Sequence, residues 1–319
     1  MLTIGQVDVR DDSALRAWYA VEAASVDHDR PDAGHRSFES LAAAVQHPST
    51  HQRYLLLAAR EGTAVVGTAY LTLRDAENAH ALELEIHVHP GQRRNGIGRR
   101  LWAEVAAIGE REGRTTFFGE LTVPPPAGLA FAKAMGFDSV HEEDHLILEL
   151  PHEVEPMPTP GYEIVTWTGR CPEELLAAYV RLRNQMELDV PIGDVDLAPS
   201  VYTAERIREQ EDRTARSYER ITAAARDRTT GDLVAYSLVF LPFDSTDVIQ
   251  DDTLVMPSHR GHRLGHALKR TTLELIRHGY PERRRIHSWT APENDPMRSL
   301  NATFGFRAVD RVHEVQRRA

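Results

Sequence analysis

Two glycine-containing segments of the sequence have residue types and spacing that suit the binding of phosphate. The first reads Arg-Arg-Asn-Gly-Ile-Gly over residues 93–98, and lies between a predicted strand that ends at Val88 and a predicted helix. At the start of a helix the backbone N–H groups have no partners and form a cradle for phosphate oxygens. Gly96 and Gly98 let the backbone approach a ligand without an intervening Cβ. The segment therefore predicts a pyrophosphate site.

The second segment, residues 260–265, repeats the first at a constant offset in the sequence. The same offset already relates the ends of the preceding strands, Val88 and Val255. It places Arg263 where the first has Gly96, which costs backbone freedom but adds a cation. The Gly136-Phe137 pair also recurs, at Gly305-Phe306. One such loop is weak evidence, but two copies, each with a strand before and a helix after, indicate a duplicated domain. Neither copy has the Gly-Lys-Ser/Thr of a nucleotide-binding P-loop.

Acidic residues occupy the strand just before the first loop. Strand alternation over residues 81–88 puts Glu83, Glu85 and His87 on one face. A carboxylate beside a cofactor loop is a candidate general base, and the other interpretation is a solvated strand face. In the second copy Asp252 is the aligned carboxylate, and Gln250 stands opposite Glu83 in the alignment.

The same order of elements is predicted twice, as two helices, a hairpin, a strand, the loop, a long helix, a strand and a short helix. We place domains at 1–150 and 162–319, separated by a linker at 151–161 whose four prolines do not suit a helix interior. The ranges expected for the main elements are 14–25, 38–45, 54–59, 64–73, 99–112 and 116–123 in the first copy, and 172–188, 203–211, 221–225, 233–241, 266–278 and 286–290 in the second.

Composition narrows the classes of function. The chain has 319 residues with 48 acidic and 37 basic ones, a net charge of −11, which argues against nucleic-acid and anionic-membrane partners. A single cysteine, Cys171, and the lack of a signal-like or membrane-length apolar segment predict a cytoplasmic protein. His259, His262 and His266 lie close together, but no carboxylate or cysteine completes a set, so no metal site is expected.

The repeated Arg-x-x-Gly-x-Gly loop and the Gly-Phe turn resemble the GNAT superfamily of N-acetyltransferases. Two copies in one chain are similar to the tandem GNAT proteins of actinobacteria, in an architecture like that of mycothiol synthase. The resemblance implies an α/β (α+β) fold with two GNAT-like domains. Each would be a mixed, mostly antiparallel sheet flanked by helices, with its fourth and fifth strands splayed apart at a bulge.

The resemblance also implies acetyl-CoA as co-substrate and direct transfer of its acetyl group to the primary amine of a small molecule. Glu83, Glu85 or Asp252 would be the base. Asn294 is a cofactor contact or a helix cap. The expected cofactor contacts are Val88, His89, Arg93, Arg94, Asn95, Gly96, Ile97 and Gly98 in the first copy, and Val255, Arg260, Gly261, His262, Arg263, Leu264, Gly265 and Asn294 in the second.

The sequence departs from the family at one catalytic position. The tyrosine that often protonates the leaving thiolate is replaced by Ala132 in the first copy and Asn301 in the second. This leaves an alternative open, in which one or both domains bind CoA esters without turning them over. The acceptor, the catalytic copy and the oligomeric state are not set by the sequence.

Acidic loops near the first two helices of each copy are candidates for attracting a cationic acceptor. The other interpretation is a solvated loop in an acidic protein. The residues are Asp27, Asp29 and Asp32 in the first copy and Asp189, Asp194 and Asp196 in the second.

Overall fold

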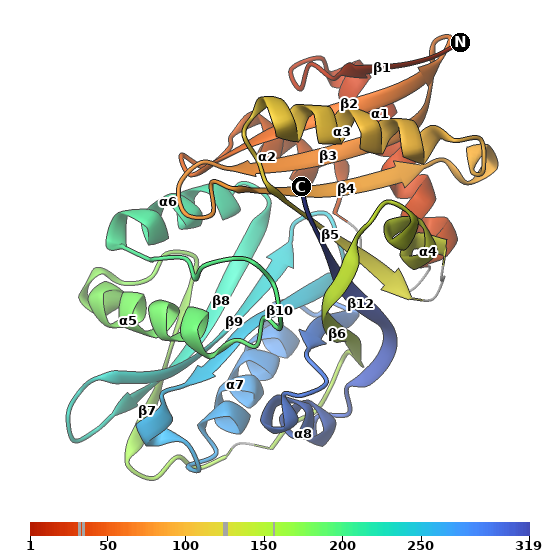
Figure 1. Ribbon diagram of the computed structural model, residues 1–319. Coiled ribbons are helices and arrows are strands. Elements are labelled where there is room, and N and C mark those ends of the chain that lie inside the picture. The colour runs from red at the N-terminus through yellow and green to blue at the C-terminus, as the bar shows by residue number, and fades with distance from the viewer. Residues whose placement is uncertain (31–32, 34–35, 124–126, 156) are drawn as a thin grey trace. The chain divides into compact units, whose positions relative to one another are not determined.

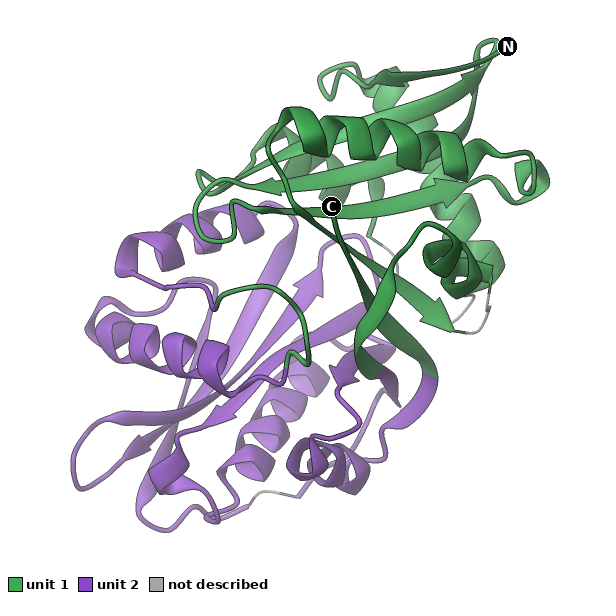
Figure 2. Ribbon diagram, in the orientation of Figure 1, with its two compact units in different colours: residues 1–143, 192–198, 310–319 green, residues 144–191, 199–309 purple. Residues whose placement is uncertain are grey.

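The computed structural model describes residues 1–319 except 31–32, 34–35, 124–126 and 156. The chain folds into two compact units (Figure 2). Unit 1 contains Met1–Glu143, Ile192–Ala198 and Asp310–Ala319, and unit 2 contains Asp144–Pro191 and Pro199–Val309. This division differs from a single cut at 151–161, because each unit takes its last strand from the other half of the sequence.

Unit 1 is built on a sheet with the order β1-β2-β3-β4-β5-β12. Its neighbouring strands are antiparallel except for the parallel pair β4 and β5. The C-terminal strand enters this sheet beside β5 with residues 311–318. The strands are β1 (Leu2–Gln6), β2 (Gln52–Glu61), β3 (Ala64–Arg74), β4 (Ala81–Val88), β5 (Thr116–Val123) and β12 (Arg307–Arg318).

Helices cover both faces of this sheet (Figure 1). The first two, α1 (Asp12–Asp29) and α2 (Phe38–Gln46), are capped by the side chains of Asp11 and Ser37 and pack on one face. On the other face, α3 (Ile97–Arg111) and α4 (Ala127–Ala134) bury their apolar sides against Leu82 and Leu84 of β4. The alternation predicted for β4 is thus observed, because its leucines face the core.

Two glycines let α3 lie close to the sheet. A Cβ on Gly109 would be 2.4 Å from the ring of Phe117, and a Cβ on Gly67 would be 2.7 Å from Cγ2 of Ile97. Any larger residue at these positions would push the helix outward. The closeness fixes the start of α3, and with it the loop that precedes the helix.

Unit 2 repeats the architecture. Its sheet has the order β6-β11-β10-β9-β8-β7, with residues 144–149 of β6 at one edge. Only β10 and β11 run parallel among its described pairs. The strands are β6 (Asp138–Glu149), β7 (Tyr162–Thr168), β8 (Tyr218–Asp227), β9 (Leu233–Pro242), β10 (Asp247–Val255) and β11 (Arg285–Thr290). Here α5 (Glu173–Asp189) and α6 (Ala204–Thr214) pack on one face, and α7 (Leu264–Gly279) and α8 (Asp295–Thr303) on the other.

The mixed, mostly antiparallel fold agrees with the prediction, and the predicted hairpins, long helices and short helices are present in both units. Sequence patterns missed the strands that begin and end each half, which are β1, β6, β7 and β12. The expected bulge occurs only in unit 2, where the pairing of β10 with β9 shifts between Gln250 and Thr253. The pairing of β4 with β3 is regular throughout. In the described part of the chain, no helix is long and apolar enough to cross a membrane.

Candidate functional site

The two central parallel strands of each unit separate soon after they meet. In unit 1, β4 and β5 pair only from Ala81 with Thr116 to Glu83 with Phe118. In unit 2, β10 and β11 pair only from Asp247 with Arg285 to Ile249 with His287. Each unit therefore has an opening between its central strands, and the glycine-containing loop follows the strand on one side of it.

The loop of unit 1 presents a row of backbone amides without partners. Gly96 forms the cap of α3 in a left-handed conformation (φ 79°), and Arg94 also has a positive φ of 68°. Arg100 donates the first helical hydrogen bond, 3.1 Å to the Gly96 carbonyl oxygen. No described protein atom accepts a hydrogen bond from the amides of residues 94–99. Such a cradle binds phosphate oxygens.

The loop of unit 2 has left-handed residues at the same two positions as the loop of unit 1, but glycine and arginine have exchanged places. Gly261 (φ 84°) and Arg263 (φ 57°) take the two left-handed positions, so each loop has one glycine and one arginine there. The predicted loss of backbone freedom at Arg263 is therefore real, but the fold of the loop survives it. Non-glycine residues adopt this conformation at a cost of about 1–2 kcal/mol.

The first arginine of each loop ties the loop to the preceding helices. The Arg93 guanidinium donates to the carboxylate of Asp29 at 2.7 and 2.8 Å, to the Ser25 hydroxyl at 3.0 Å and to the Val88 carbonyl oxygen at 3.2 Å. These arginines were predicted as cofactor contacts, and the structure places their side chains in internal pairs.

Arg260 repeats the arrangement in unit 2, with the Val255 carbonyl oxygen at 3.2 Å and the Asp189 carboxylate at 2.5 Å. Two of the predicted acceptor-attracting aspartates, Asp29 and Asp189, are thus loop anchors. Asp32 lies outside the described residues.

The other predicted cofactor residues take several places. Ile97 and Leu264 are buried in their cores and anchor the helix starts, so only their amides face the loop. The His89 ring accepts a hydrogen bond from the Gly91 amide at 3.2 Å. Asn294 caps α8 by accepting from the Met297 amide at 3.2 Å. This contact matches the helix-cap alternative for Asn294. The exposed ones are His89, Arg94, Asn95, Gly96, Gly261, His262 and Arg263, and those of intermediate exposure are Val88, Gly98, Val255 and Gly265.

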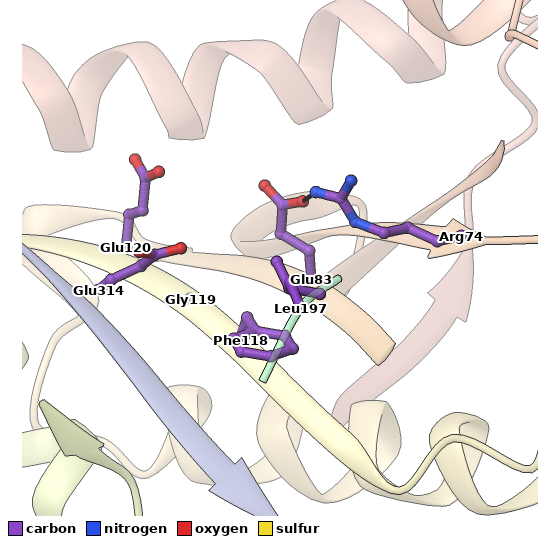
Figure 3. Close-up of a pocket in the computed structure, with 7 residues that line it drawn as sticks. All are labelled: Arg74, Glu83, Phe118, Gly119, Glu120, Leu197 and Glu314. Atoms are coloured by element: carbon purple, nitrogen blue, oxygen red, sulfur yellow. Dashed lines mark hydrogen bonds and ion pairs between the residues drawn. The ribbon is translucent and has the colours of Figure 1, made fainter. Parts of the chain in front are cut away.

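A hollow of about 110 Å³ opens in unit 1 at the separation of β4 and β5. Glu83 stands on one side, hydrogen-bonded to Arg74 at 2.8 Å, and Glu120 and Glu314 stand on the other side (Figure 3). The hollow is lined by Arg74, Glu83, Phe118, Gly119, Glu120, Leu197 and Glu314. Acidic groups outnumber basic ones in this lining, three to one, which suits a cationic ligand.

Two of these carboxylates are direct neighbours across antiparallel strands. Glu120 of β5 pairs with Glu314 of β12 in the sheet register. Like charges directly opposite each other destabilise a sheet. The Glu120 side chain reaches solvent through the hollow, yet surrounding protein raises the pKa of its carboxyl group, and Glu83 and Glu314 raise it further, to about 8. Burial and Glu83 also raise the pKa of Glu314. Sequence reasoning missed both residues.

Glu85 differs from Glu120 in its surroundings. Its carboxylate is 3.6 Å from Nε2 of His87 and 3.7 Å from the Arg36 guanidinium. Burial acts to raise the pKa of Glu85, but His87 and Arg36 overcome it and hold this pKa at about 2. A carboxylate that releases its proton so readily is a weak base near neutral pH. Glu83 and Glu85 thus share a strand face but not an environment.

The matching position in unit 2 is changed by the bulge in β10. At the last parallel pair, Ile249 occupies the place of Glu83. Asp252 accepts a hydrogen bond from the Tyr236 hydroxyl at 2.7 Å and lies 3.6 Å from the buried Arg183 guanidinium. The Asp251 side chain is more exposed than that of Asp252. The protein around its carboxyl group and the charge of Asp252 nevertheless raise the pKa of Asp251. The carboxylates of unit 2 are therefore accompanied by a cation.

The remaining candidate residues are buried or held by contacts within the protein. Ala132 is buried in the core of unit 1. The carbonyl oxygen of the Asn301 side chain accepts from the Lys269 ammonium at 2.8 Å, and burial lowers the pKa of Lys269 to about 7. Burial raises the pKa of the Cys171 thiol to about 12, so that thiol is not a nucleophile at neutral pH. Among the described residues, no three His, Cys, Asp or Glu side chains gather as a metal site.

Comparison with known proteins agrees with this geometry. Residues 15–137 match the model of the acetyltransferase (GNAT) family. These residues are a GNAT acetyltransferase domain. A tandem GNAT protein from the clavulanic acid biosynthesis pathway, solved without acetyl-CoA, aligns over 100% of this chain and 98% of its own, with 27% identity and a TM-score of 0.86. The whole chain has the tandem GNAT fold.

More distant structures share the fold alone. A GCN5-related N-acetyltransferase from Sphaerobacter thermophilus aligns over 99% of this chain and 95% of its own, at 16% identity and a TM-score of 0.69. One from Kribbella flavida aligns over 88% and 96%, at 15% identity and a TM-score of 0.52. No curated protein is significantly similar to the sequence. Residues 15–137 and the fold of the whole chain are thus similar to GNAT acetyltransferases.

Proposed function

We propose that unit 1 transfers an acetyl group from acetyl-CoA directly to the primary amine of a small cationic molecule, with Glu120 as the general base. The supporting observation is the cluster of Glu83, Glu120 and Glu314 in the hollow where β4 and β5 separate. A protein keeps like charges together against their repulsion where the site uses them.

The loop of unit 1 fits the diphosphate of acetyl-CoA. The amides of residues 94–98 have no acceptors among the described residues, and a Cβ on Gly96 would meet no described atom within 4 Å. Beyond Glu83, β4 has no pairing with β5, so its backbone is open to an extended ligand arm there. Bound acetyl-CoA supplies an acyl group that is activated as a thioester, together with a thiolate leaving group.

The carboxylates of the hollow then act on the acceptor. An ammonium group is drawn to Glu83, Glu120 and Glu314, and Glu120 takes one of its protons. The free amine attacks the thioester carbonyl carbon, a nitrogen–carbon bond forms, and the carbon–sulfur bond breaks. The second nitrogen proton leaves with the product thiol. Arg74 holds Glu83 in place by a hydrogen bond of 2.8 Å. Burial, together with the charges of Glu83 and Glu314, raises the pKa of Glu120 and makes it basic enough to deprotonate an amine.

The size of the hollow limits what enters it. A volume of about 110 Å³ takes an amine head with a few carbons, since one water molecule occupies about 30 Å³ in the liquid. The rest of the acceptor lies outside the hollow. Ala132 supplies no acid, so the CoA thiolate leaves without a tyrosine proton.

Thiol release from acetyl-CoA across a panel of small amines and diamines tests this function. Glu120→Gln should lower kcat/KM by about 10²–10⁴-fold, the usual contribution of a general base. Glu110→Gln, on the exposed side of α3, is the matched control and should leave the rate unchanged. If calorimetry shows acetyl-CoA binding while no amine causes thiol release, or if Glu120→Gln keeps full activity, the proposal is wrong.

A further inference from the structure

Unit 2 contains two buried arginines with unused hydrogen-bond donors. Arg183 of α5 is 5% exposed and Arg220 of β8 is 3% exposed. In each, the Nε and Nη1 nitrogens have no hydrogen-bond partner in the described structure. Buried donors without acceptors are rare in folded proteins and cost about 1–3 kcal/mol each, more when charged. Their presence calls for an acceptor.

The neighbouring carboxylates do not fill this need. Nη1 of Arg183 is 4.0 Å from Asp251, and Nη2 is 3.6 Å from Asp252, beyond hydrogen-bonding distance. Nη2 of Arg183 donates to the Tyr202 hydroxyl at 2.9 Å. The charges attract, but the donors of the guanidinium stay available.

Arg220 is in a similar position. Its Nη1 is 3.9 Å from Glu211. The Glu211 carboxylate is already bound to the Cys171 amide at 2.8 Å and to Arg208 at 2.7 Å. The negative charge of Glu211 therefore attracts Arg220, but the carboxylate does not accept a hydrogen bond from Nη1 of Arg220.

A further polar group beside them is also unsatisfied. The Thr222 hydroxyl is buried and has no hydrogen-bond partner in the described structure. The Arg183 guanidinium lies 6.0 Å from the centre of the Tyr236 ring, and the Arg220 guanidinium lies 5.6 Å from the centre of the Phe240 ring. Both rings belong to one apolar cluster on β9, so the two arginines lie over the same face of that strand.

Solvent reaches this region beside the two aspartates. The Asp251 side chain is 37% exposed and the Asp252 side chain is 20% exposed. An incoming molecule would meet negative oxygens at the entrance and positive nitrogens behind them. Arg183 lies within 4 Å of both aspartates. A ligand that pairs with all three side chains must therefore carry its anionic and cationic groups close together.

We propose that unit 2 binds a small zwitterion of the α-amino-acid type. Its carboxylate accepts hydrogen bonds from Arg183 and Arg220, and its ammonium group lies between Asp251 and Asp252. Hydrogen bonds from a guanidinium group to a carboxylate oxygen are charge-assisted, so a ligand carboxylate would offer each arginine an acceptor for an unpartnered nitrogen. The hollow of unit 1 cannot serve in this way, since Arg74, its arginine, is already bound to Glu83.

Thermal melting of the full-length protein with each of the twenty standard L-α-amino acids tests the inference. At least one amino acid should raise the melting temperature, because a ligand that binds only the folded state stabilises it. Its deaminated acid and its decarboxylated amine should each bind at least about tenfold more weakly, as each lacks one of the two groups. If no amino acid raises the melting temperature, or if the deaminated acid binds as well, the inference is overturned.

Variants locate the site. Arg183→Lys keeps the charge but loses the fork, and Asp251→Asn changes an exposed side chain, so the second should fold even if the first does not. Both should weaken amino-acid binding at least about tenfold. Arg181→Lys is the control, since Arg181 is 57% exposed on the same helix.

Glu120→Gln separates this inference from the function proposed for unit 1. That variant should bind the amino acid as the unaltered protein does, even if the function proposed for unit 1 fails. Binding that survives Asp251→Asn, or that disappears in Glu120→Gln alone, would contradict a site in unit 2.

Discussion

The openings of the two units share a backbone and differ in how their carboxylates are compensated. In unit 1, Glu120 pairs with Glu314 on the neighbouring strand, and Arg74, which lines the hollow, is bound to Glu83. In unit 2, Asp252 is bound by Tyr236 and stands beside the buried cation of Arg183. The arrangement in unit 1 makes Glu120 more basic, whereas the arrangement in unit 2 leaves hydrogen-bond donors of Arg183 without acceptors.

The loops differ less than the openings. Both loops have two left-handed residues and an arginine anchor to the preceding helix, and only the order of glycine and arginine changes. A duplicated fold thus keeps its backbone while side chains at the openings diverge. Loop similarity alone therefore does not show which unit carries out the chemistry.

The largest expected difference between the units concerns acetyl-CoA turnover. Gly96→Val places a β-branched residue at φ 79° in the cradle and should raise the KM for acetyl-CoA by about tenfold or more. Gly261→Val, at φ 84° in the loop of unit 2, is the matched variant and should leave this KM unchanged. Steady-state kinetics measures both.

Equal effects of the two valine variants would assign turnover to both units. An effect of Gly261→Val alone would assign it to unit 2 and would contradict the proposed roles.

Removing one carboxylate from each unit should change stability in opposite directions. The folded-state pKa of Glu120 is about 8, above its ordinary value of 4.5, so folding takes up a proton between these values. Stability contributed by this group is therefore lost as pH rises from 4.5 to 8. Glu120→Gln should melt at a higher temperature than the unaltered protein above pH 8, and at the same temperature near pH 4.

Asp252→Asn should instead lower the free energy of unfolding at pH 7, by about 1–3 kcal/mol, because Arg183 loses a compensating charge. Thermal and urea melting across pH measures both variants. A destabilised Glu120→Gln above pH 8, or a stabilised Asp252→Asn, would show that the two openings do not differ in the way described.

The smallest difference concerns the long helices that follow the loops. Gly109→Ala in α3 would bring a methyl group within 2.4 Å of Phe117, and should lower the free energy of unfolding by about 1 kcal/mol after the gain in helix propensity. Gly279→Ala in α7 meets nothing within 4 Å and should be neutral or slightly stabilising. Urea unfolding compares them, and equal shifts would mean that α3 is not held close to the sheet.

Features that depend on neighbouring residues were predictable from the sequence. The loop between strand and helix, the leucine face of β4 and the hairpins follow from local patterns, and the structure has them. The duplication added the tandem fold. The strands at the ends of each half were missed because they lack the turn signals that bound a hairpin.

The hollow could not be predicted, because its parts are distant in sequence. Glu314 reaches unit 1 through β12, which pairs with β5 from the far end of the chain, and no local pattern marks it. The pKa of Glu120 is raised by burial in the folded protein and by Glu83 and Glu314, which come close only in the fold. The bulge in β10 likewise puts Ile249, rather than Gln250, at the position in unit 2 that corresponds to Glu83. The base assignments to Glu83, Glu85 and Asp252 stay predictions.

The pH dependence of kcat/KM, measured for the unaltered protein and for Glu314→Gln with one amine acceptor, tests the role of Glu120 most directly. The acceptor's own titration is common to both proteins, so the difference between the profiles belongs to the site. The account predicts a profile that rises with an apparent pKa of about 8 and moves to lower pH in Glu314→Gln, because the variant removes one of the charges that raise the pKa of Glu120. Profiles that coincide, or that show no rise near pH 8, would contradict it.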